Sequence, residues 1–321
     1  MRTAIIGLGV IGAVHINVLK SSNDTTIVAV CDVNQDKLNL YPEIAGYTDY
    51  KQMLDEVKPD VVHICTPHYL HAEMVIAALE RDINVLCEKP LCIDKQDIPL
   101  ILEAEKNSKA QLGVCFQNRY NISTLFVKEY LKNKEVLCAY GRMMWHRDQT
   151  YYNQAQWRGS KKYEGGSVLI NQSLHTIDLL QWFMGMPNTV IGWCANVSLQ
   201  DVIDTEDTAT VICRGDKEFS ILATNVAARD FPTEIVFKTT TDTIRMFPKG
   251  VFVNDTFYDF KGVDEVCGKR VYGNGHYDLI NDFYDCVKTG RKFPIDGLEG
   301  AKAVKIVLSA YESKGEEIVC K

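Results

Sequence analysis

The chain has 321 residues, of which 46% are hydrophobic and 24% charged, and its formal net charge is −7 at pH 7. This is the composition of a globular protein, and at about 150 residues per domain the length predicts two domains. The negative charge, without any block of Lys and Arg, argues against a nucleic-acid partner. No apolar run approaches the roughly 18 residues of a membrane span, and the N-terminus carries no export signal, so we expect a cytoplasmic protein with no membrane partner.

The first third of the chain alternates between apolar strands and helices. Predicted strands cover residues 3–6, 26–31, 61–65, 84–87 and 111–115. Predicted helices cover residues 12–21, 49–57, 69–81 and 94–108. The strands are continuous apolar runs, which indicates that helices cover both faces of the sheet. The alternation therefore predicts a right-handed, doubly wound parallel sheet.

The pattern changes near Asn118. A strand is predicted over residues 136–147, and a single strong helix follows over residues 166–184. Predicted strands then cover 189–199, 207–214, 218–226, 233–238, 243–247 and 251–253, and two helices close the chain at 276–289 and 297–315. Turn signals separate the strands and indicate an open, mostly antiparallel sheet with helices on one face. We divide the chain into α/β residues 1–118 and α+β residues 119–321, with the last helices able to pack back on the first domain.

A glycine-rich segment, Gly7-Leu8-Gly9-Val10-Ile11-Gly12, joins the first predicted strand to the first helix. Gly7 permits a tight turn, Gly9 lets the backbone approach a pyrophosphate, and Gly12 lets the helix pack closely on the strand. The positive end of the helix would also face the phosphates. Asp32 ends the second strand, where an acid hydrogen-bonds a ribose diol. We predict dinucleotide binding, and NAD over NADP because Asp32 would repel a 2′-phosphate and no Arg follows it.

Two motifs stand at the C-terminal ends of later strands, where parallel sheets bind ligands. In the first, Thr66 and Pro67 leave the strand and are expected to contact the cofactor. His68 and His71 form a His-x-x-His pair, but no further ligand is placed to complete a site, so we expect no metal. The 11 cysteines form no Cys-x-x-Cys pair, and those in strand-like runs, Cys31, Cys65, Cys87, Cys115, Cys194 and Cys213, are expected to be reduced and buried.

The second motif is Glu88-Lys89-Pro90. At the end of its strand, the Lys89 ammonium could hold a substrate oxygen and help to move a proton as hydride leaves the neighbouring carbon. Glu88 could pair with Lys89 or orient the cofactor ribose. The alternative is a surface ion pair that precedes a helix, and the position at a strand end favours the functional interpretation.

The predicted helix 166–184 carries a polar stripe. Asn171, His175 and Asp178 fall at i, i+4 and i+7 on one face. The residues expected to pack into the core on another side are Leu174, Ile177, Leu180 and Met184. A solvent-facing stripe is the alternative, but Trp182 shares the polar face, which suits a cleft. His175 is thus a candidate general acid or base at a substrate hydroxyl.

Taken together, these motifs resemble the Gfo/Idh/MocA family, named for glucose–fructose oxidoreductase, inositol dehydrogenase and a rhizopine-catabolism protein. The resemblance rests on the glycine motif followed by His15, on Cys65-Thr66-Pro67 with His71, on Glu88-Lys89-Pro90, and on Gly165-Gly166 leading to His175 and Asp178. The stretches 276–283 and 294–303 also fit, so it covers nearly the whole chain. It implies a Rossmann domain, a C-terminal sheet that shields the nicotinamide face, and oxidation or reduction at a ring carbon of a sugar, cyclitol or related polyol.

The resemblance also implies roles for individual residues. Lys89 and His175 match the catalytic residues, whereas the family often has Asp where this chain has Asn171. The candidate cofactor contacts are Gly7, Leu8, Gly9, Val10, Ile11, Gly12, Asp32, Val33, Cys65, Thr66, Pro67, His71, Glu88, Lys89, Gln117, Trp157 and Arg158. The candidate supporting or substrate-binding residues, several of which suit a polyol, are Asn118, Tyr120, His146, Tyr151, Asn171, Gln172, Asp178 and His276.

The leading functional prediction is an NAD-dependent oxidoreductase acting on a secondary carbinol of a carbohydrate or cyclitol. One alternative is glycoside cleavage through transient oxidation by retained NAD, and another is a non-catalytic dinucleotide-binding protein. A homodimer or homotetramer is expected through the C-terminal sheet. The apolar residues expected to supply that contact are Ile235, Phe237, Ile244, Met246, Phe252 and Phe257.

Overall fold

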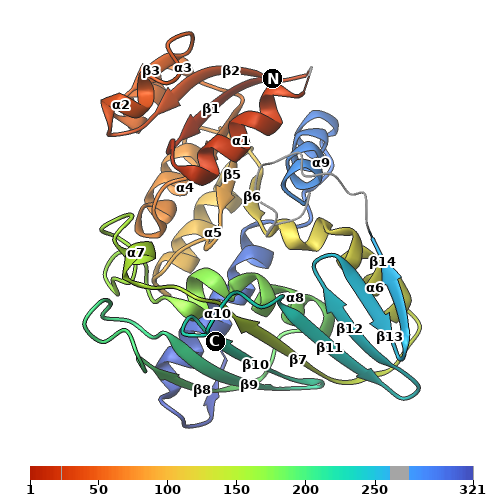
Figure 1. Cartoon of the computed structure of the whole chain (residues 1–321). Helices are drawn as coiled ribbons and strands as arrows, with labels where there is room; N and C mark the ends of the chain where they lie inside the picture. The colour runs from red at the N-terminus through yellow and green to blue at the C-terminus, as the bar shows by residue number, and fades with distance from the viewer. Residues whose placement is uncertain (23, 261–274, 321) are drawn as a thin grey trace. The chain divides into compact units, whose positions relative to one another are not determined.

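The computed structural model describes residues 1–22, 24–260 and 275–320 (Figure 1). The chain divides into two compact units, each described below by itself. The first unit contains residues 1–117 and helix α9 (Gly275–Thr289) and continues to residue 301. The second contains the described residues of 118–260 and residues 302–320.

The first unit is built on a six-stranded parallel sheet in the order β3-β2-β1-β4-β5-β6. Its strands are β1 (Arg2–Ile6), β2 (Thr26–Cys31), β3 (Ala45–Tyr47), β4 (Val61–Ile64), β5 (Asn84–Glu88) and β6 (Leu112–Cys115). Its other helices are α1 (Val10–Lys20), α2 (Gln35–Leu38), α3 (Tyr50–Val57), α4 (His71–Leu79) and α5 (Asp97–Asn107). The predicted doubly wound parallel sheet is confirmed. Its strand order reverses between β1 and β4, the place where such sheets bind ligands.

Two short elements of this unit were not predicted, and two helices begin later than expected, α4 at residue 71 and α5 at residue 97 instead of 94. Strand β3 and helix α2 are three and four residues long, too short for a periodic pattern to show. The helix expected from residue 69 begins as α4 at His71, because residues 68–70 form a 3₁₀ turn. The side chain of Asp49 caps α3 by accepting hydrogen bonds from the N–H groups of Lys51 and Gln52.

The second unit contains a nine-stranded sheet in the order β14-β13-β12-β11-β7-β10-β9-β8-β15. Its strands are β7 (Val136–Met144), β8 (Thr189–Ala195), β9 (Thr208–Arg214), β10 (Glu218–Thr224), β11 (Glu234–Thr239), β12 (Thr243–Phe247), β13 (Gly250–Val253), β14 (Thr256–Asp259) and β15 (Ile318–Val319). Its helices are α6 (Ile122–Leu131), α7 (Gln149–Tyr152), α8 (Leu174–Met184) and the larger part of α10 (Gly297–Ser313). Of the described strand pairs in this sheet, only β7 and β10 are parallel, so the predicted mostly antiparallel sheet is confirmed.

The helix predicted over residues 166–184 is wrong in its first part. A π-helical turn covers Val168–Gln172, and the regular helix α8 starts only at Leu174. The backbone N–H groups of Ser167 and Leu169 donate to the Glu206 carboxylate, at 3.1 and 3.0 Å, so side-chain bonds satisfy this end of the helix. Asn171 and His175 therefore lie on two different kinds of turn, and their spacing is not that of one regular helix.

Helix α8 packs very closely on the central strand β7 of the sheet. This packing holds the side chains of α8 in place. The predicted core residues Leu174, Ile177, Leu180 and Met184 are all buried. A Cβ atom on Gly141 of β7 would lie only 2.7 Å from Thr176 Cγ2, so the glycine permits this approach. Helix α6 and strands β14 and β15 were not predicted.

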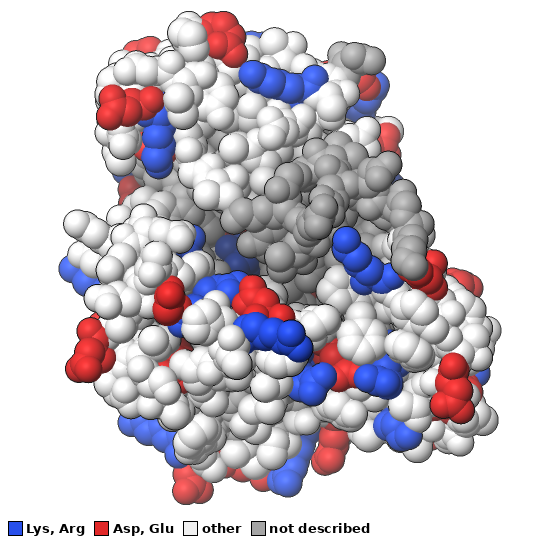
Figure 2. Space-filling model, viewed as in Figure 1, with Lys and Arg blue, Asp and Glu red and all other residues white. Residues whose placement is uncertain are grey.

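The described residues contain no membrane-spanning helix, and the face drawn in Figure 2 carries charges of both signs. No helix among them is long and apolar enough to cross a bilayer. On the face drawn in Figure 2, basic and acidic side chains lie scattered among one another. No disulfide joins the cysteines of residues 1–22, 24–260 and 275–320.

Candidate active site

The glycine turn of the first unit leaves room for a ligand at one glycine and for none at the other two. Gly7 has a φ of +94°, and a Cβ atom there would lie 2.5 Å from the Cys65 carbonyl oxygen. On Gly12 it would lie 2.0 Å from the Gly7 oxygen. At Gly9, the N-cap of α1, no described atom lies within 4 Å of the Cβ position, and no side chain caps the helix. The fold requires Gly7 and Gly12, whereas Gly9 leaves open the space that a pyrophosphate needs.

Alanine substitutions should separate these two roles. We expect Gly12→Ala to lower both the stability and the NAD affinity, because backbone atoms cannot yield to the new methyl group. Gly9→Ala should keep the melting temperature of the parent and lose NAD affinity alone. Thermal unfolding and NAD titration of both variants measure this. Equal stabilities for the two variants would contradict the assignment.

Asp32 is held at the end of β2 by backbone and side-chain donors. Its Oδ2 accepts from the N–H of Leu8 at 2.8 Å, and its Oδ1 accepts from the N–H of Asn34 at 3.0 Å. Lys37 Nζ lies 3.0 Å from the same Oδ2. Lys37 was not expected beside Asp32, because helix α2, which carries it, was not predicted. By contrast, the side chain of the predicted contact Val33 is 89% exposed.

His71 joins two backbone segments, contrary to its expected role as a cofactor contact. Its Nδ1 lies 2.6 Å from the Pro90 carbonyl oxygen, and its Nε2 lies 2.8 Å from that of Thr66. The residue is buried, and this burial lowers its pKa. His71 therefore fixes the segments that follow β4 and β5, on which Thr66, Pro67 and Lys89 stand.

Glu88, the last residue of β5, is a buried carboxylate that accepts hydrogen bonds from several donors. His15 Nε2 and His276 Nε2 lie 3.0 and 3.3 Å from its Oε1, and the backbone N–H of Lys89 lies 3.2 Å from its Oε2. Burial alone would raise the pKa of Glu88, but the bonds from the two histidines outweigh it and hold the pKa well below its usual value. Glu88 is thus ionised and anchors the backbone of Lys89. His276, predicted to contact substrate, is buried against Glu88 instead.

A chain of buried hydrogen bonds, here called the histidine chain, continues from His15 through the unit. His15 Nδ1 lies 2.7 Å from His63 Nδ1, His63 Nε2 lies 2.9 Å from Tyr284 Oη, and that oxygen lies 2.7 Å from Thr3 Oγ1. Burial lowers the pKa of His15 and, more strongly, that of His63, so both rings are neutral.

The hydrogen-bond network assigns every proton in the histidine chain. A carboxylate only accepts, so His15 donates from Nε2 to Glu88 and accepts at Nδ1. His63 must then donate from Nδ1 and accept at Nε2 from Tyr284, whose oxygen accepts from Thr3. All donors therefore point toward Glu88.

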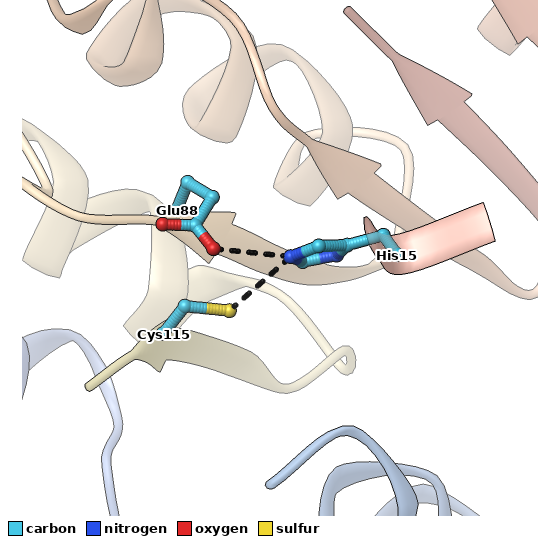
Figure 3. Close-up of side chains that lie close together, drawn as sticks. All are labelled: His15, Glu88 and Cys115. Atoms are coloured by element: carbon cyan, nitrogen blue, oxygen red, sulfur yellow. Dashed lines mark hydrogen bonds and ion pairs between the residues drawn. The ribbon is translucent and has the colours of Figure 1, made fainter. Parts of the chain in front are cut away.

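His15, Glu88 and Cys115 stand at the spacing of a metal site (Figure 3). Cys115 Sγ lies 4.0 Å from His15 Nε2. Burial and the nearby Glu88 charge raise the pKa of Cys115 well above its usual value, so it is a thiol and not the thiolate that binds metals. A metal at His15 Nε2 would also need every proton in the histidine chain reversed. The group is best described as a hydrogen-bonded cluster.

In the second unit, three predicted residues line one pocket. Asn118, Gln172 and His175 surround it together with Asn121, Trp145 and Thr176. Gln172 Nε2 donates to the hydroxyl of Tyr151 at 3.1 Å, and the Arg158 guanidinium lies 4.6 Å from the Tyr151 ring centroid.

Several predicted residues of this unit have other partners. Asp178 is fully buried and receives two hydrogen bonds from Arg119, at 2.8 and 2.5 Å, so it holds the fold rather than a substrate. The Arg119 guanidinium also lies 5.2 Å from the Trp182 ring centroid. His146 is exposed and bonds the Ala227 carbonyl through Nδ1 at 2.9 Å, outside the pocket.

Besides Lys37, sequence reasoning missed four polar residues that the structure ties to predicted ones or to their partners. Asn225 donates to Gln172 Oε1 at 3.2 Å. Glu164 accepts a hydrogen bond from Asn171, and His63 and Tyr284 belong to the histidine chain. Glu164 had a signal, since it directly precedes the Gly165-Gly166 pair of the resemblance.

Comparison with protein families places both parts of the chain. Residues 1–116 match the model described as an oxidoreductase family with an NAD-binding Rossmann fold, and residues 135–244 match the GFO/IDH/MocA C-terminal domain. A myo-inositol 2-dehydrogenase of Thermotoga maritima is 27% identical over 67% of this chain and 65% of its own length. A D-glucoside 3-dehydrogenase of Escherichia coli is 29% identical over 58% of this chain and 55% of its own. The matched segments thus span less than two thirds of these relatives.

Solved structures share the fold over the whole chain. The WlbA dehydrogenase of Chromobacterium violaceum, in complex with NADH and UDP-GlcNAcA, has a TM-score of 0.87 and 25% identity, covering 100% of this chain and 96% of that one. A levoglucosan dehydrogenase in complex with NADH and levoglucosan has a TM-score of 0.88 at 18% identity, covering 100% and 99%. The likeness to the levoglucosan dehydrogenase shows the fold alone.

Proposed function

Because the chain belongs to the Gfo/Idh/MocA family of NAD-binding oxidoreductases, we propose that it transfers a hydride between NAD and a secondary carbinol of a sugar, sugar derivative or cyclitol. The observation that carries the proposal is Lys89. It directly follows β5 at the C-terminal edge of the nucleotide-binding sheet, with its backbone anchored on a buried, ionised Glu88. The names of relatives, which include inositol and glucoside dehydrogenases, support the substrate class.

Bound NAD would supply the hydride acceptor, and the chain would supply binding and proton handling. Gly9 and the start of α1 would hold the pyrophosphate, and Asp32 a ribose diol. The Lys89 ammonium would bind the substrate oxygen and stabilise negative charge that forms on it. His175, which lines the pocket of the second unit, would take or return the hydroxyl proton.

The cofactor preference that we propose is NAD over NADP. Asp32 is 8% exposed and already accepts two backbone N–H groups, so it stays in place to repel a 2′-phosphate. Lys37 offsets part of that charge. NAD and NADP titrations of the same preparation compare the two, and equal affinities would overturn the preference.

The experiment that tests the function follows NADH absorbance with myo-inositol, methyl D-glucoside, levoglucosan and a UDP-linked uronic acid as substrates. NAD reduction by any of these supports the proposal, whereas no redox signal despite measured NAD binding contradicts it. Product analysis in the same assay identifies bond cleavage without net redox. If neither NAD reduction nor bond cleavage is observed although NAD binds, the result supports a non-catalytic dinucleotide-binding protein.

We further propose a homodimer or homotetramer through the open face of the nine-stranded sheet. The residues expected there were largely wrong, because Ile235, Phe237, Ile244 and Met246 are buried within the chain. Phe257, which was expected there, is exposed, and the sheet also exposes Leu137, Tyr140, Trp193, Ile212 and Leu222. Light scattering at working concentration should give a mass of two or four chains. A monomer would contradict this prediction.

The cytoplasmic location expected from the sequence also stays a prediction.

A further inference from the structure

Glu164 is a buried carboxyl group of the second unit that the proposed mechanism does not use. Its side chain is fully buried. Its Oε2 accepts from the backbone N–H of Gly159, and its Oε1 accepts from the side-chain Nδ2 of Asn171. Both of these contacts use an oxygen as an acceptor, so the two are strongest together when the group is an ionised carboxylate.

The charged groups that face Glu164 come from three segments. Arg158 favours the ionised form, Glu206 opposes it, and Tyr152 lies close enough to respond to the Glu164 charge. Burial has the largest effect and raises the pKa of Glu164 to about 7, against the lowering effect of the hydrogen bonds from Gly159 and Asn171. Above neutral pH both oxygens of Glu164 therefore accept fully, whereas a proton on either oxygen weakens acceptance there and no longer holds the Asn171 amide by charge.

This contact decides which way the Asn171 amide points. An amide has an oxygen and an NH₂ group of nearly equal size, and by itself either can face a given neighbour. A carboxylate accepts only the NH₂ group, so Oδ1 of Asn171 is turned to the opposite side. Asn171 is half-buried on the turn that leads directly to Gln172 and His175, the pocket residues.

We propose that Glu164 is a positioning residue, which turns the Asn171 amide so that its Oδ1 accepts a hydrogen bond from a substrate hydroxyl. The inference rests on the proposed function for the identity of that substrate. It requires a substrate with a hydroxyl group to donate, which every polyol has. It also accounts for the pairing of a buried acid with an amide here, because a second carboxylate at position 171 would repel the first.

The structure permits the acid and the amide to be exchanged. In E164Q, glutamine has one acceptor for two N–H donors, and its NH₂ group faces another donor. In N171D, two carboxylates meet in a buried place. In the double variant E164Q/N171D, the new amide at position 164 accepts from Gly159 and donates to the new carboxylate at position 171. That carboxylate keeps a second oxygen, which is again presented as an acceptor.

Four variants test this at about pH 8, above the pKa of Glu164: E164Q, N171D, E164Q/N171D and the control E206Q/N171D. Glu206 is likewise buried, but it accepts from the backbone N–H groups of Ser167 and Leu169 in the same segment. Each single variant should lower kcat/KM about tenfold, the loss of one oriented hydrogen bond. The double variant should return to within about threefold of the parent, whereas the control should not.

At about pH 6 the kcat/KM values of the parent and E164Q should converge, because Glu164 is then protonated.

Additive losses in E164Q/N171D, or an unchanged kcat/KM in E164Q, would overturn the inference. The urea midpoint of unfolding gives a second readout that needs no substrate. The urea midpoint of E164Q/N171D should recover the stability that each single variant loses. NAD titration of each variant checks that the first unit is intact. If the parent reduces NAD with none of the substrates, the proposed function fails, and the midpoints still decide whether Glu164 orients Asn171.

Discussion

Replacing Lys89 by alanine is expected to lower turnover by about 10³-fold, within the range for removal of a group that moves a proton. The NAD dissociation constant should change little. The contact between Lys89 and Glu88 is made by the backbone N–H, which alanine keeps, so the end of β5 stays in place. Steady-state NADH absorbance with the most active substrate of the panel measures turnover, and fluorescence titration measures NAD binding.

Two further variants make the Lys89 result specific. Lys89→Arg keeps a positive charge but replaces a compact ammonium with a group that stays protonated, so turnover should remain low. Lys51→Ala removes an exposed lysine of the same unit, which pairs with Glu73, and should match the parent. Parent-like turnover in Lys89→Ala would remove this residue from the mechanism.

The free energy of unfolding is expected to fall steeply as the pH decreases below about 6.5. Burial lowers the pKa values of His15, His63 and His71, so these rings stay neutral in the folded protein. In the unfolded chain each takes up a proton near pH 6.5. At these three histidines the unfolded state then binds up to three more protons, which lowers stability by at most about 4 kcal/mol per pH unit. Glu164, whose pKa folding raises to about 7, takes up a proton in the folded state and offsets up to about a third of that loss. Glu88, with its lowered pKa, adds to the loss below about pH 4.5.

Urea unfolding at a series of pH values between about 7.5 and 5 checks this. The second unit contains all four tryptophans, at positions 145, 157, 182 and 193, so their fluorescence reports only the unfolding of that unit. Circular dichroism is needed to detect the unfolding of the first unit as well. His63→Asn removes one titrating ring and should reduce the histidine contribution to the slope by up to about a third, whatever its fixed cost in stability. A flat profile down to about pH 5.5 would mean that these histidines protonate in the folded state.

The features that the sequence predicted well depend on residues that are close together in the chain. The glycine turn, Asp32 and the strand ends that carry Thr66 and Lys89 follow from short patterns in the chain, because a parallel sheet places strand ends along one edge. Burial of Leu174, Ile177 and the other core residues of α8 also follows from periodicity. These predictions need no knowledge of which distant segments meet.

What it missed depends on distant contacts. His276 and Tyr284 reach Glu88 and His63 across 188 and 221 positions, and no spacing rule reports such a meeting. Asp178 was taken for a substrate residue because its periodicity is right, but its partner is Arg119, 59 positions away. The π-helical turn at Val168–Gln172 arises from a third distant residue, Glu206, which accepts the N–H groups beside it.

The histidine chain sets a limit on how this protein can be divided. Its members come from β1, α1, β4 and β5 and from α9. In the sequence, α9 comes after strands β7 to β14 of the second unit, and only β15 of that sheet follows it. A fragment that stops at residue 117 would keep every candidate cofactor contact up to Gln117 but leave His63 without Tyr284 and Glu88 without His276. The nucleotide-binding unit is therefore not an independent module of the N-terminal sequence, because residues that complete its interior are supplied only after most of the second unit has been made.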